Sequence, residues 1–174
     1  MLQITNASIL TVRGKVVENS MPRFFRRLAE GIFDLEDLRF RTNELADFVQ
    51  NASNTYAYDP NRMMAIGYSN GANIAVSMLL HRPEILSSAI LFRPMIPLVP
   101  DTLPILSTKN ILISAGLHDP LISRLQTEDL IVPVKEVGAN VSIQWQNSGH
   151  ELTQKDVKTA REWVLSSFNT KMDA

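Results

Sequence analysis

The sequence predicts a three-layer α/β fold built on a mostly parallel sheet. Two observations carry this prediction. Short runs with strand composition alternate along the chain with longer runs that have helical spacing. Most of the short runs are continuously apolar, which is typical of strands covered on both faces. The length of 174 residues suits one domain that spans residues 1–174.

Five segments have the composition of buried strands. They are residues 7–13 (ASILTVR), 63–68 (MMAIGY), 87–92 (SSAILF), 110–115 (NILISA) and 141–146 (VSIQWQ). Runs of this length without regular polar alternation indicate a parallel sheet with helices on both faces. The five runs are therefore expected to form the central sheet.

Helical segments lie between and after these runs. They are residues 37–49, whose apolar residues share one face, residues 72–81, which end before Pro83, and residues 154–168. Thr153 is expected to cap the last helix, because Asp156 stands where a capping box has an acidic residue. Residues 123–138 should form a helix after the fourth strand, and Pro133 predicts a break within it.

Composition excludes several classes of function. The net charge of −1 gives no bulk attraction to nucleic acid or to an anionic membrane. The sequence contains no cysteine, and its three histidines lack ligand spacing, so no disulfide and no metal site are expected. No apolar run approaches the roughly 18 residues of a membrane span, and the N-terminus lacks a signal-peptide pattern. We therefore expect a cytoplasmic protein.

One motif points to nucleophilic chemistry. Residues 67–71 read Gly-Tyr-Ser-Asn-Gly and match the G-x-S-x-G pattern, between an apolar strand and an alanine-rich helix. The serine of this pattern sits on a sharp turn, and glycine at both flanking positions leaves room for the backbone. The next helix directs its N-terminus at the site, so the backbone amide of Asn70 is a candidate oxyanion donor. The alternative is a plain strand-to-helix turn.

Two further residues lie where a serine nucleophile needs a base and an orienting acid. Asp119 follows the fourth strand, and His150 lies in the loop after the last strand. Ser69, Asp119 and His150 should therefore meet at one edge of the sheet, in the chain order of the α/β-hydrolase triad. An Asp-Pro turn and a helix-entry loop are the alternative interpretations of Asp119 and His150. His81 ends a helix and is expected to face away.

The motifs together resemble a known family. The segments GYSNGANIA, AGLHDPLIS and NSGHELT are similar to those of small bacterial carboxylesterases of the phospholipase/carboxylesterase family. Residues 9–45 are similar to a subgroup associated with resistance to quinones and hydroquinones. The resemblance implies an α/β-hydrolase fold and a serine esterase without a cofactor. It makes Ser69 the nucleophile, His150 the base and Asp119 the orienting acid.

The resemblance also concerns the pocket and the start of the chain. It favours a pocket wall that contains Arg23, Phe24, Phe25 and Tyr68, and the alternative is a surface turn whose aromatic rings fill the core. Members of the family begin with a further strand that ends in a His-Gly-Thr-Gly-Gly loop, which donates the second oxyanion amide. This sequence contains no such motif. We therefore expect an N-terminally truncated fold that lacks one strand–helix unit, with weak activity.

Several alternatives stay open at this point. The strands on either side of the absent unit could pair directly, another chain could supply the strand, or the chain could be a fragment. The leading function is a serine carboxylic-ester hydrolase that acts through an acyl-enzyme. A hydrolase-fold protein that only binds a ligand, and a thioesterase or acyltransferase on the same triad, are the alternatives. The expected partner is a small-molecule ester, and a homodimer is left open.

Overall fold

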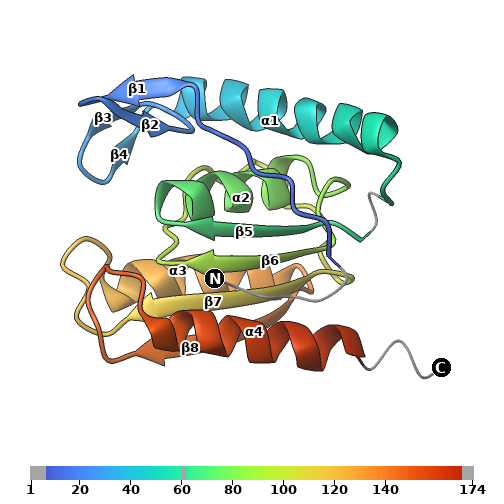
Figure 1. Cartoon of the computed structure of the whole chain (residues 1–174). Helices are drawn as coiled ribbons and strands as arrows, with labels where there is room; N and C mark the ends of the chain where they lie inside the picture. Colours follow the sequence, from blue (N-terminus) through green and yellow to red (C-terminus); the bar gives the residue numbers. More distant parts are fainter. Residues whose placement is uncertain (1–6, 60–61, 170–174) are drawn as a thin grey trace.

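A four-stranded parallel sheet forms the centre of the structure, a computed structural model that describes residues 7–59 and 62–169 (Figure 1). The strands, in their order across the sheet, are β5 Met64–Tyr68, β6 Ser88–Phe92, β7 Asn110–Gly116 and β8 Asn140–Gln146. Each strand pairs with the next one along the chain. The register aligns Tyr68 with Phe92 and Phe92 with Ser114, so the carboxyl ends of these strands lie at one edge. The predicted parallel α/β class is therefore confirmed.

Helices cover both faces of this sheet and give it three layers (Figure 1). Their bounds are α1 Leu35–Tyr56, α2 Asn70–His81, α3 Arg124–Glu136 and α4 Gln154–Asn169. Successive residues of β6 alternate between two cores. Ala89 and Leu91 pack with α1, α2 and α3, whereas Ile90 and Phe92 pack with α4. None of the helices within the described residues has the length and apolar character that a membrane crossing requires.

Two helix ends test the sequence predictions. At the start of α4, the backbone N–H and hydroxyl of Thr153 donate to Asp156 Oδ2 at 2.8 and 2.7 Å, which confirms the capping box. The predicted break at Pro133 is wrong, because α3 continues to Glu136. Pro133 stands in the last turn, and Asp129, whose carbonyl loses a helical partner, is exposed to water.

The predicted first strand is also wrong. Residues 7–14 form no strand, and Ile9 is 71% exposed. Among the described residues, no strand pairs with β5 on the side away from β6. An extended segment without a neighbouring strand has no ladder of hydrogen bonds to join. Direct pairing between residues 7–13 and β5 therefore does not occur, and Ile66 on β5 remains 49% exposed.

Two short antiparallel hairpins lie between this segment and α1. They pair β1 (Val16–Glu18) with β2 (Met21–Arg23), and β3 (Arg27–Ala29) with β4 (Ile32–Phe33). In Figure 1 they lie near the start of α1, at the end of the molecule toward which β5 and β6 point. Strands of two or three residues leave no hydrophobic period in the sequence, so no pattern predicted them.

Candidate active site

Ser69 occupies a strained turn between β5 and α2. Its backbone has φ 51° and ψ −114°, a positive φ that is uncommon for a residue other than glycine. The Ser69 N–H donates to the carbonyl of Phe92, at the end of the neighbouring strand, over 2.9 Å. The strain is therefore held by a hydrogen bond across the carboxyl edge of the sheet.

The two glycines of the motif are not equivalent. A Cβ on Gly67 would lie 2.4 Å from the carbonyl oxygen of Gly71 and 2.6 Å from the Ala72 nitrogen. A Cβ on Gly71 would meet only the Cε2 atom of Phe24, at an ordinary 3.6 Å. The expectation that both positions need glycine for space is therefore wrong for Gly71.

Three side chains meet beside this turn. His150 Nε2 lies 3.0 Å from Ser69 Oγ, and His150 Nδ1 lies 2.8 Å from Asp119 Oδ2. The Asp119 side chain is 1% exposed and that of His150 is 19% exposed. Asp119 Oδ1 accepts the backbone N–H groups of Leu121 and Ile122 at 2.8 and 3.1 Å, which fixes the carboxylate. This geometry can pass a proton from the Ser69 hydroxyl to His150.

The first turn of α2 supplies amide groups at the same place. The helix begins at Asn70, and the first backbone N–H groups of any helix have no acceptor within it. The Asn70 side chain faces the other way, since its Oδ1 accepts the backbone N–H of Phe24 at 2.7 Å. The segment that contains Phe24 is therefore tied directly to the Ser69 turn.

The structure separates the residues expected in the pocket wall. Phe24 is half-buried against Gly71, whereas Phe25 has 0% exposure and packs with Leu38 and Ile74. The chain bends at these two residues, between β2 and β3, and the fully buried Phe25 ring belongs to a core cluster. The expectation that Phe25 lines the pocket is therefore wrong.

Arg23 and Tyr68 also have defined contacts. The Arg23 guanidinium lies 3.3 Å from a carboxylate oxygen of Glu18, and burial lowers its pKa from the ordinary value. Tyr68 donates its hydroxyl to the backbone carbonyl of His150 at 3.0 Å, and burial raises the pKa of this phenol. Tyr68 thus contacts the loop of His150, and Arg23 is engaged in an ion pair within the hairpins.

Similarity to known proteins identifies the family of this chain. The sequence matches the dienelactone hydrolase family over residues 22–170. The chain belongs to this family. It is 47% identical over 163 residues to MhqD of Bacillus subtilis (strain 168), a protein named as a hydrolase, with 94% of this chain and 82% of that protein covered.

Solved structures of carboxylesterases share the fold of this family member. The carboxylesterase of Bacillus cereus is 50% identical with a TM-score of 0.87, over 90% of this chain and 74% of that one. The carboxylesterase of Mesorhizobium loti is 28% identical with a TM-score of 0.79, over 87% of this chain and 72% of that one. The chain is therefore a hydrolase of the dienelactone hydrolase and carboxylesterase type with an α/β-hydrolase fold, and the resemblance found in the sequence is confirmed.

One residue of this hydrolase that the sequence did not predict is Arg93, directly after β6. It is 1% exposed and has a positive φ of 52°. Its guanidinium forms an ion pair with Asp156, which is fully buried at the start of α4, at 2.9 Å. Burial works to raise the pKa of Asp156, but hydrogen bonds from Arg93, Ser114 and Thr153 outweigh it and lower this pKa to about 2.

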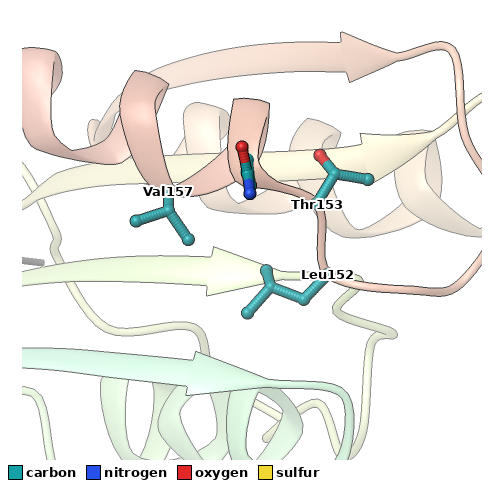
Figure 2. Close-up of a pocket in the computed structure, with 4 residues that line it drawn as sticks. Leu152, Thr153 and Val157 are labelled. Atoms are coloured by element: carbon teal, nitrogen blue, oxygen red, sulfur yellow. The ribbon is translucent and has the colours of Figure 1, made fainter. Parts of the chain in front are cut away.

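The surface of the described residues contains hollows, of which two have defined linings. One has a volume of about 220 Å³ and is lined by Leu152, Thr153, Gln154 and Val157; Figure 2 shows Leu152 and Val157 pointing to the same side. The other has a volume of about 420 Å³ and lies between Glu30–Ile32 and the residues Pro120, Leu121 and Gln126. Pro120 directly follows Asp119 in the sequence, but Asp119 itself does not line this hollow. In the described ranges, no three His, Asp or Glu side chains gather as metal ligands would.

Proposed function

We propose that this dienelactone hydrolase family member is a serine hydrolase that cleaves carboxylic esters. The observation that carries the proposal is the chain of contacts from Ser69 Oγ to His150 Nε2 at 3.0 Å, and from His150 Nδ1 to Asp119 Oδ2 at 2.8 Å. A hydroxyl is a poor nucleophile until a base within hydrogen-bond reach takes its proton.

In the first half of the reaction, Ser69 Oγ attacks the acyl carbon of the ester and His150 Nε2 takes the hydroxyl proton. Asp119 holds the imidazole by its Nδ1–H and stabilises the imidazolium. The Asn70 amide at the start of α2 donates to the oxyanion of the tetrahedral intermediate. The carbon–oxygen bond to the alcohol then breaks, His150 gives its proton to the departing alkoxide, and the acyl group remains on Ser69.

In the second half, water replaces the alcohol. His150 takes a proton from water as the water oxygen attacks the acyl carbon, and a second tetrahedral intermediate forms. Its collapse breaks the bond to Ser69 Oγ, which recovers the proton from His150. The carboxylic acid leaves and the enzyme returns to its starting state. Only groups of this chain and water take part.

We propose that two aromatic side chains contact the substrate. Tyr68 is 40% exposed and lies beside His150, with the two ring centroids 5.5 Å apart. The half-buried Phe24 lies near Gly71, two residues after Ser69. We propose that these aromatic rings form apolar walls beside the reacting ester.

The test compares the parent protein with Ser69→Ala, and with Ser107→Ala as a control at an exposed serine before β7. The measurements are hydrolysis of p-nitrophenyl acetate and covalent labelling by a fluorophosphonate. Ser69→Ala should reduce turnover to background, a loss of roughly 10⁴–10⁶-fold, and should abolish labelling. Ser107→Ala should match the parent.

Three results would contradict the proposal in different ways. Labelling that persists in Ser69→Ala would show that another residue is the nucleophile. A parent protein that is neither labelled nor active on any ester would favour a binding protein of the same fold. Faster turnover of a thioester than of the matching oxygen ester would move the substrate class to thioesters and leave the triad in place.

A further inference from the structure

We infer that Arg93 is a positioning residue that holds His150 between Ser69 and Asp119, an inference that rests on the proposed function. Arg93 does not touch the three side chains of the triad through any hydrogen bond described for it. It acts on the backbone of the loop that carries His150.

The contacts of Arg93 surround His150 in the sequence. Its Nε donates to the carbonyl of Gly149 at 3.0 Å, and its Nη2 donates to the carbonyl of Glu151 at 2.9 Å. Nη2 also reaches the hydroxyl of Ser148 at 3.0 Å. One planar guanidinium therefore forms hydrogen bonds with the residues on both sides of His150.

The carbonyl of His150 itself has a separate donor, the hydroxyl of Tyr68 at 3.0 Å. Three consecutive carbonyl groups of the loop, those of residues 149, 150 and 151, thus each accept a hydrogen bond from a side chain outside the loop. Two of the three donors belong to Arg93. A short loop fixed at three successive peptide groups has little freedom to turn the imidazole away from Ser69.

Arg93 is itself firmly held. Its Nη1 and Nη2 donate to the two carboxylate oxygens of Asp156 at 2.9 and 3.0 Å, and its backbone N–H donates to the carbonyl of Ser114 at 2.8 Å. Arg93 and Asp156 side chains are both 0% exposed. A planar fork can satisfy a carboxylate and two carbonyls together, whereas the single ammonium of lysine cannot reproduce this geometry.

The same strand end also positions the nucleophile. The carbonyl of Phe92 accepts the N–H of Ser69 at 2.9 Å, and Arg93 is the next residue. Two adjacent residues thus hold the Ser69 turn on one side and the His150 loop on the other. This arrangement sets the separation of 3.0 Å between Ser69 Oγ and His150 Nε2.

The competing explanation is that Arg93 only neutralises the buried Asp156 and stabilises the fold. Arg93→Lys separates the two roles, because it keeps a positive charge near Asp156 and loses the fork that reaches both carbonyls. Arg82→Lys is the matched control. Arg82 also pairs with two carboxylates, Asp47 and Glu84, but it lies at the end of α2 where the chain leaves the site.

Four quantities are measured for the parent, Arg93→Lys and Arg82→Lys: kcat and KM for an activated ester, the thermal midpoint, and the low-field proton NMR signal of the His150–Asp119 hydrogen bond. Three histidines make this signal assignable with a His150→Gln reference. Arg93→Lys should lower kcat by about 10–100-fold, as a displacement near 1 Å does, with KM changed by less than about threefold. The low-field signal should broaden or vanish. Arg82→Lys should leave both kcat and the low-field signal unchanged.

Arg93→Lys with a lower thermal midpoint but an unchanged kcat and an unchanged low-field signal would overturn the inference. Should that variant fail to fold, Ser148→Ala decides the question, because it removes one contact of Nη2 and leaves the buried ion pair intact. It should lower kcat by about threefold and broaden the same signal. Unchanged values in Ser148→Ala would overturn the inference as well.

The outcome is separable from that of the proposed function. A parent protein whose hydrolysis does not depend on Ser69 would refute the esterase mechanism alone. The low-field proton would still report whether Arg93 orders His150, since that signal requires no substrate and no turnover.

Discussion

Alanine at Gly67 should distort the turn that contains Ser69, whereas alanine at Gly71 should not. The Cβ added at Gly67 would lie 2.4 Å from the Gly71 carbonyl oxygen, and ordinary contacts begin at 3.4 Å. The first turn of α2 must therefore retreat by about 1 Å, and the obstacle is backbone rather than a flexible side chain. Such overpacking typically costs about 1–3 kcal/mol of unfolding free energy. A displacement of this size next to Ser69 should also slow its reaction by about 10²-fold.

The same substitution at Gly71 is expected to change the unfolding free energy in the opposite direction. Its Cβ would rest 3.6 Å from the Phe24 ring, an ordinary van der Waals contact, in the first turn of helix α2. Alanine is a better helix former than glycine by up to about 1 kcal/mol, and less of this difference applies in a first turn. Gly71→Ala should therefore be as stable as the parent or slightly more stable.

The assay combines urea denaturation with the rate of fluorophosphonate labelling. Each variant is compared with the parent at one pH and one temperature, so that the difference in midpoint reports the backbone clash and the rate reports Ser69. Gly67→Ala that unfolds at the parent midpoint and is labelled at the parent rate would refute the reasoning. A Gly71→Ala variant whose unfolding free energy is more than about 1 kcal/mol below that of the parent would also refute the reasoning.

Two further predictions concern the His150 loop and acid stability. Gly116→Ala would place a Cβ 2.2 Å from the Gly149 carbonyl oxygen, so it should slow fluorophosphonate labelling by about 10²-fold, and a parent-like rate would contradict this. Burial lowers the pKa of His81 below its ordinary value, with a smaller contribution from the charge of Arg39. The unfolded chain then binds the proton first, so the unfolding free energy should fall as pH falls below about 6.5. His81→Gln should flatten this dependence in urea denaturation at pH 7.5 and 5.5, and equal slopes in the two proteins would contradict it.

The sheet could be predicted from sequence because buried parallel strands need continuous apolar runs. The four runs predicted at 63–68, 87–92, 110–115 and 141–146 fall within one residue of β5 to β8 at each end. Residues 7–13 have the same composition and form no strand. Strand formation requires a neighbour to pair with, and this is a property of the whole sheet that a local pattern does not contain. The two hairpins before α1 were not predicted, because their strands are too short to show a hydrophobic period.

The candidate site was predictable to the extent that it depends on strand ends. Ser69, Asp119 and His150 each follow a strand by a few residues, and parallel strands in sequential order bring those ends to one edge. Arg93 follows β6 in the same way, yet nothing in the sequence shows that its side chain reaches residues 149–156. A single long side chain that donates to backbone carbonyls 56 and 58 residues away leaves no spacing to recognise.

The strain at Ser69 explains why the site depends on these long-range contacts. A residue other than glycine at φ 51° costs about 1–3 kcal/mol, and such a conformation persists only where its surroundings fix it. The carbonyl of Phe92 fixes Ser69 from β6, and the Gly67 backbone lies directly against the first turn of α2. The His150 loop has no regular structure of its own, and its contacts come from Arg93, Tyr68, the start of α4 and the His118 N–H, which donates to the Ser148 carbonyl at 3.0 Å. Residues at the end of β6 thus contact both Ser69 and the His150 loop: the Phe92 carbonyl accepts the Ser69 N–H, and Arg93, which is paired with the buried Asp156, donates to the carbonyls of Gly149 and Glu151.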